Sequence, residues 1–213
     1  EINKIQAVVG RGGMLKPIAS GVYQVNDAMK SDLYDHPIKE HASNLGGLIA
    51  DDIARALPDA KAYIADPVVV DELDEIARVS GHPLFKRISI FHALNQKSIA
   101  RQHAKSIMKH YEDLNLIIVH MGGGITIGAH QKGKVIDVNQ GLDGEGPFSP
   151  ERSGTLPSGD LVRFCFSGKY SEKEVLKMVV GNGGIVAYLG TNSAYEAEQR
   201  AQNGDEQAKF ILE

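Results

Sequence analysis

Short apolar runs alternate along the chain with segments in which apolar residues recur every three or four positions. The runs are rich in β-branched residues and predict strands; they are Gln6–Val9, Val22–Val25, Lys61–Ala65, Leu114–His120, Ile125–His130 and Lys134–Asn139. The helical spacing predicts helices from Ser43 to Pro58, from about Asn95 to Tyr111, from Ser158 to Phe166, from Val175 to Val180 behind a capping box at Ser171–Glu174, and over Ala194–Glu213. The mixture predicts an α/β protein.

A run of three glycines joins two of the predicted strands. Gly122, Gly123 and Gly124 lie between the strand that ends at His120 and the strand that contains Thr126. No side chain covers such a turn, so its backbone N–H groups are open to an anion such as phosphate. A plain hairpin with a tight turn explains the same glycines equally well.

Two further candidates stand near the ends of the early strands. Arg11 lies between glycines, where its guanidinium has room to bind a carboxylate or a phosphate. Asp66 follows the strand that ends at Ala65 and precedes Pro67, which is a common place for an active-site carboxylate in α/β folds. The alternatives are a surface arginine in a turn and an aspartate that begins a turn.

Three more polar residues occupy loops or helix starts. His92 precedes a predicted helix and could hold an anion at its positive end, or could be an interfacial histidine with a hydrogen-bond partner. Asn44 could face a site or cap the helix that begins beside it. Arg152 is the strongly cationic residue of a long glycine- and proline-rich loop, a kind of segment that is more often functional than decorative.

Composition narrows the class of partner. The chain has 213 residues, a net charge of −4 and a pI near 6.1, which argues against nucleic acid or an anionic membrane as the main partner. The single cysteine, Cys165, is expected to be a buried thiol, and a cytoplasmic location fits this cysteine usage. We find no membrane-length apolar segment, no Walker loop and no Cys/His metal cluster in the sequence.

Five segments share a recognisable pattern; they are Val8–Gly13, Ala65–Leu73, Ile90–Lys97, Val119–Thr126 and Gly141–Gly154. Together they resemble the acetate kinase family, in the branch that acts on butyrate and branched-chain carboxylates. The residues around the two histidines, Phe-His-Ala-Leu-Asn-Gln and His-Met-Gly-Gly-Gly-Ile-Thr, resemble those of the butyrate branch.

The resemblance implies an actin-like ATPase fold, related to ribonuclease H, with two similar domains around a cleft and only part of both in this chain. Residues 1–68 would be the latter part of the first domain, on the carboxylate-binding side. Residues 69–213 would begin the second domain and carry the phosphate loop. The resemblance implies catalytic roles for Arg152, His120, His92 and Asp66, carboxylate binding by Arg11 and Asn44, and nucleotide phosphate binding by Gly122, Gly123 and Gly124, and it gives no residue as a metal ligand.

The implied reaction is phosphorylation of a short-chain carboxylate by ATP with Mg²⁺, by direct in-line transfer to give an acyl phosphate. A homo-oligomer is also expected. The alternatives are another actin-like ATPase or sugar kinase, or an inactive fragment that serves only for binding or oligomerisation. Because the family's first phosphate loop and its adenosine segment have no match here, we expect the 213-residue chain alone not to bind ATP normally. Titration with Mg-ATP tests this, and micromolar affinity would contradict it.

Overall fold

The computed structural model describes residues 2–35 and 41–213. The chain forms two compact units: unit 1 consists of Glu1–Ile118 and Gly128–Val138, and unit 2 of Val119–Ile127 and Asn139–Glu213. These units are bodies defined by contacts within this chain. The division into domains at residue 68 concerns the longer fold that the resemblance implies, and it stays a prediction.

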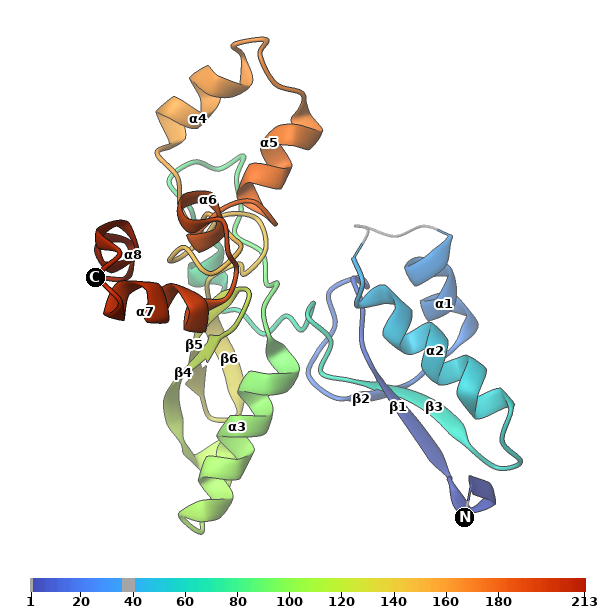
Figure 1. Ribbon diagram of the computed structural model, residues 1–213. Coiled ribbons are helices and arrows are strands. Elements are labelled where there is room, and N and C mark those ends of the chain that lie inside the picture. Colours follow the sequence, from blue (N-terminus) through green and yellow to red (C-terminus); the bar gives the residue numbers. More distant parts are fainter. Residues whose placement is uncertain (1, 36–40) are drawn as a thin grey trace. The chain divides into compact units, whose positions relative to one another are not determined.

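Unit 1 begins with a three-stranded sheet covered by two helices (Figure 1). After the short 3₁₀ helix η1 (Ile2–Lys4), strands β1 (Ala7–Arg11), β2 (Val22–Gln24) and β3 (Lys61–Ala65) pair in the order β1-β3-β2, with β1 parallel and β2 antiparallel to β3. Helix α2 (Asn44–Arg55) packs on β1 and β3, and α1 (Asp27–Tyr34) packs on α2. The expected strands and the α2 helix are therefore confirmed.

Two local features explain this first layer. Gly10 and Gly46 meet where α2 crosses β1, so closely that a Cβ on Gly10 would collide with the Gly46 carbonyl. The segment Asp27–Tyr34, which follows neither apolar pattern, is helical because the Asn26 side chain caps it, accepting the Met29 N–H at 2.9 Å.

A second sheet contains β4 (Asn115–Met121), β5 (Ile125–Gln131) and β6 (Lys134–Val138), in that order. Lys132 and Gly133 form the β5–β6 turn with positive φ angles of 48° and 83°, a conformation typical of two-residue hairpin turns. Helix α3 (Ala93–Ser106) and η3 (Tyr111–Asp113) precede the sheet, and η2 (Glu75–Arg78) lies before α3. Ala100, Ala104 and Tyr111 form a buried cluster against Leu114, Leu116 and Ile118, so the first residues of β4 are fixed on α3.

After β6, unit 2 begins with an irregular segment, residues 139–157, and its later regular elements are helices. It contains α4 (Ser158–Cys165), α5 (Glu172–Val179), α6 (Ile185–Leu189), α7 (Ala194–Gln202) and α8 (Glu206–Leu212). The predicted capping box at α5 is present, since Ser171 and Glu174 exchange both hydrogen bonds. α6, α7 and α8 share a core of Ile185, Leu189, Ala197 and Ala208.

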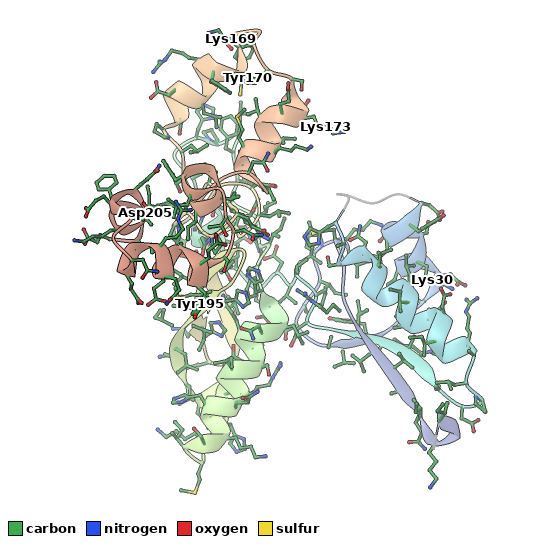
Figure 2. All side chains as sticks on the ribbon, in the orientation of Figure 1. Lys30, Lys169, Tyr170, Lys173, Tyr195 and Asp205 are labelled. Atoms are coloured by element: carbon green, nitrogen blue, oxygen red, sulfur yellow. The ribbon has the colours of Figure 1, made fainter. Side chains whose placement is uncertain are left out.

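Two expectations for this region are wrong. The predicted helix over Ala194–Glu213 is two helices, because Gly204 takes a φ of 90° and Asp205, labelled in Figure 2, caps α8 by accepting the Ala208 N–H at 3.0 Å. Cys165 is exposed, since no residue of α4 is fully buried. Among the described residues, no helix is long and apolar enough to cross a membrane.

Candidate active site

The first group of predicted residues gathers where β1 and β3 end. The two strands are parallel, with Arg11 opposite Ala65, so Arg11 and Asp66 come to the same edge of the sheet. Arg11 is exposed at this edge. Asn44 is buried, and its Oδ1 accepts the Met14 N–H at 2.8 Å, which ties the glycine-rich loop after β1 to the start of α2.

Asp66 is the most constrained of these groups. It is only 5% exposed and has a φ of 37°, an unusual backbone conformation for a residue other than glycine. Its Oδ1 accepts the Ser20 hydroxyl at 2.6 Å and the Gly21 N–H at 2.9 Å. Its Oδ2 accepts Nη1 of Arg101 at 3.0 Å, from helix α3. Both carboxylate oxygens are thus held in a fixed orientation.

Arg101 is a residue that the sequence analysis did not select. It looks like an ordinary surface arginine on a helix, and its side chain is 50% exposed. With Asp66 it lines an open cavity of about 390 Å³, to which Lys105, Ser98 and Gln102 contribute other polar groups. The buried Asp66 carboxylate therefore lines an open cavity together with two cationic side chains, Arg101 and Lys105.

His92 stands at the N-cap of α3, as the sequence predicted. Its side chain makes no capping hydrogen bond to the helix, and its carbonyl accepts the Gln96 N–H at 3.0 Å. The ring is partly exposed and is not needed to begin the helix. The His92 side chain therefore does not cap α3, and its two expected roles, anion binding or an interfacial histidine, both stay predictions.

The glycine turn lies in unit 2, between β4 and β5. The Gly122 N–H donates to the Gly124 carbonyl at 3.1 Å, so this amide already has an acceptor within the turn. His120 lies beside the turn, with Nε2 only 3.1 Å from where a Cβ on Gly122 would be. Thr126 is fully buried behind it.

Arg152 lies against this turn. Its Nη1 donates to the Gly141 carbonyl, and its guanidinium covers Gly124 so closely that a Cβ there would collide with it. Among the described residues, its Nε is a buried side-chain nitrogen without a hydrogen-bond partner. Burial lowers the pKa of Arg152, while the charges of Glu151 and Asp143 oppose this shift. The guanidinium is thus largely desolvated and keeps one N–H unsatisfied.

Two residues that the sequence analysis missed hold this turn. Ser149 is 2% exposed, and its hydroxyl donates to the Gly123 carbonyl at 2.6 Å. The Asn139 side chain accepts the Ile127 N–H at 2.7 Å and donates to the Ile125 carbonyl at 3.1 Å. Neither side chain is unusual for its position in the sequence, so no sequence signal identifies it.

The structure therefore brings the predicted residues together in two groups. Arg11, Asn44 and Asp66 surround one sheet edge in unit 1, which also contains His92. Gly122, Gly123, Gly124, His120 and Arg152 lie together in unit 2. The roles assigned to these residues stay predictions.

The architecture defines a class of protein. Over its whole length the chain superimposes on 56% of an acetate kinase from Porphyromonas gingivalis, with a TM-score of 0.81 and 19% identity. It also matches a propionate kinase from Francisella tularensis subsp. tularensis, with a TM-score of 0.72 and 23% identity, over 97% of this chain and 54% of that one. The fold is the actin-like ATPase fold of these kinases, as predicted.

Sequence comparison specifies the family. Residues 84–213 match the model of the acetokinase family. A relative named butyrate kinase 2, from Clostridium acetobutylicum, is 61% identical over 209 residues, which are 98% of this chain and 58% of the relative. The chain belongs to the acetokinase family, and it spans little more than half the length of this relative.

Proposed function

We propose that the protein containing this chain transfers the γ-phosphoryl group of ATP to a short-chain carboxylate, butyrate or a branched analogue, to form an acyl phosphate and ADP. The 61% identity to butyrate kinase 2, which extends over nearly the whole chain, is the observation that carries the proposal. The candidate active site agrees with it, because its groups are suited to an anionic substrate. A sugar kinase of the same fold has no comparable support.

The proposed reaction requires that the carboxylate and the γ-phosphoryl group are aligned and that their negative charges are neutralised. A carboxylate is ionised at pH 7, so its oxygen can attack the γ-phosphorus without a general base. As the new bond between the carboxylate oxygen and the γ-phosphorus forms, the bond from the γ-phosphorus to the β–γ bridging oxygen breaks. ADP leaves with the electron pair of that bond. In this proposal Arg152, His120 and His92 stabilise the charge on the transferred group, and Arg11 and Asn44 bind the substrate carboxylate.

The residues present fit a nucleotide phosphate. The buried Nε of Arg152 has no partner among the described residues, and a phosphate oxygen is a suitable acceptor for it. Gly123 is exposed in the turn, and the Arg152 guanidinium lies directly on the buried Gly124, so the cation and the turn face the same place. Gly123 and Gly124 are the amides we assign to the phosphate, since the Gly122 N–H already donates within the turn.

Asp66 and Mg²⁺ have electrostatic roles in the proposal. Because three donors hold Asp66, we assign it a fixed negative charge that positions other groups rather than the transfer of a proton. Among the described residues, no group of three or more His, Cys, Asp or Glu side chains could hold a metal. Mg²⁺ bound mainly by the ATP phosphates is consistent with this donor set and would neutralise phosphate charge.

The remaining expectations about the whole protein belong to the same proposal. They are a cytoplasmic location, a homo-oligomeric state, and partners limited to ATP and the carboxylate, without nucleic acid or membrane. The net charge of −4 supports the last of these.

Acyl phosphate formation tests the proposed function. The full-length protein with ATP should give hydroxamate from butyrate or isobutyrate in the presence of hydroxylamine, and should leave glycerol unphosphorylated. Arg152→Ala should lose most of the turnover, at least a hundredfold by analogy with other electrostatic groups in active sites. Arg163→Ala, on the exposed face of α4, is the matched control and should keep wild-type rates. Phosphorylation of glycerol in place of the carboxylates would refute the proposal.

A further inference from the structure

Ser149 has a contact that determines the direction of one amide in the glycine turn. Its hydroxyl donates to the Gly123 carbonyl at 2.6 Å, and the side chain is almost completely buried. Its backbone is fixed as well: the N–H donates to the Arg152 carbonyl at 2.9 Å, and the carbonyl accepts the Ile185 N–H of α6 at 3.0 Å. The hydroxyl is therefore a rigid donor placed under the turn.

Peptide geometry transmits this contact to the next amide. The Gly123 carbonyl and the Gly124 N–H belong to one planar peptide unit, and in a trans peptide they point in opposite directions. When Ser149 holds the carbonyl on its own side, the Gly124 N–H faces the other side. Without that hydrogen bond the unit could rotate, because glycine has no Cβ to restrict φ and ψ.

The neighbouring residues are fixed independently. Asn139 holds the start of β5 through Ile125 and Ile127, and the Gly122 N–H is held by the Gly124 carbonyl, so the Gly123–Gly124 peptide unit is the part of the turn that can still reorient. The same segment that carries Ser149 also carries Arg152, whose guanidinium lies on Gly124. Ser149 thus couples the orientation of the amide to the position of the cation.

We propose that Ser149 is a positioning residue that keeps the Gly124 N–H directed toward a nucleotide phosphate. This inference rests on the proposed function for the identity of the nucleotide. It does not depend on which acceptor receives the phosphoryl group.

Substitutions at Ser149 in the full-length protein test the proposal. Ser149→Ala removes the donor, and Ser149→Thr keeps it. Ser149→Cys keeps the size of serine with a much weaker donor, and it replaces the alanine variant if that variant does not fold. Losing one charge-assisted hydrogen bond to phosphate should weaken ATP affinity in calorimetry about tenfold. The KM for the carboxylate should stay unchanged, and the threonine variant should bind ATP within about threefold of wild type.

A control variant and the possible outcomes distinguish the proposed role of Ser149 from the proposed carboxylate kinase function. Ser167→Ala, in the exposed segment after α4, should bind ATP as wild type does. Wild-type ATP affinity in a folded Ser149→Ala or Ser149→Cys variant would overturn the role of Ser149, as would equal weakening in Ser149→Thr. ATP binding that depends on the hydroxyl, in a protein without carboxylate turnover, would support Ser149 and refute the proposed function.

Discussion

The buried histidine of β5 should make the stability of unit 1 depend on pH. The His130 ring is 2% exposed; its Nδ1 lies 2.6 Å from the Tyr111 hydroxyl and its Nε2 lies 2.9 Å from Oε1 of Gln96. Tyr111 can donate and the Gln96 oxygen can accept, so the neutral ring with its proton on Nε2 satisfies both contacts. A second proton on Nδ1 would reverse the bond to Tyr111, with the ring donating to the hydroxyl oxygen, and would place a positive charge in a buried site.

The sign and size of the effect follow from the pKa of His130. Desolvation, and then the nearby charge of Lys97, lower the pKa of His130 from 6.5 to about 4. The unfolded chain therefore binds this proton at a higher pH than the folded chain does. The stabilisation is fully present above pH 6.5 and is lost as the pH falls toward 4. Linkage gives a loss of about 2 kcal/mol in the free energy of unfolding between pH 7 and pH 5.

Urea unfolding of the protein, followed by circular dichroism at several pH values between 7 and 4, measures this loss. His130→Asn cannot titrate, so the difference between its pH slope and that of wild type isolates this residue. His82→Asn, an exposed histidine, should keep the wild-type slope. The reasoning would be refuted by equal slopes for wild type and His130→Asn, or by an NMR titration that places the His130 pKa near 6.5.

Two further predictions concern close packing and a buried charge. Gly124→Ala should lose most nucleotide affinity because its Cβ would push the Arg152 guanidinium off the turn, whereas Gly81→Ala, where the Cβ meets nothing within 4 Å, should bind ATP normally in calorimetry. Lys97→Met leaves the carboxylate of Glu72 without the ammonium group that lies 2.7 Å from it, at a site where the lysine side chain is 1% exposed. Denaturant unfolding should show a loss of about 3–5 kcal/mol, and a loss below 1 kcal/mol would contradict the assigned ion pair.

The sequence predicts those elements whose cause is local. The β3 strand over Lys61–Ala65 and the capping box at Ser171 are present as expected, because alternation and capping depend on residues a few positions apart. The helix at Asp27–Tyr34 was not predicted, because the segment is mostly polar and buries a single residue, Leu33, so its apolar pattern is weak. The break between α7 and α8 comes from a positive φ at Gly204, which helical spacing alone does not reveal.

The same distinction between local and long-range causes separates the site residues that the sequence reveals from those that it does not. Sequence reasoning finds groups whose type is unusual for their position, such as three consecutive glycines or the carboxylate of Asp66 before a proline. It misses Arg101 and Ser149, because arginine on a helix and serine in a loop are common everywhere. Their importance comes from partners 35 and 26 residues away, Asp66 and Gly123.

Such long-range partners also explain why a composition-based expectation failed at Cys165. A lone cysteine among apolar residues is usually buried, but burial needs a surface that covers it, and no described residue of α4 is fully buried. The opposite holds at Ser149, where packing from α6 and the Arg152 segment converts an ordinary hydroxyl into a fixed donor. Residue type thus limits what a side chain can do, while the partners brought by the fold decide which of those possibilities is used.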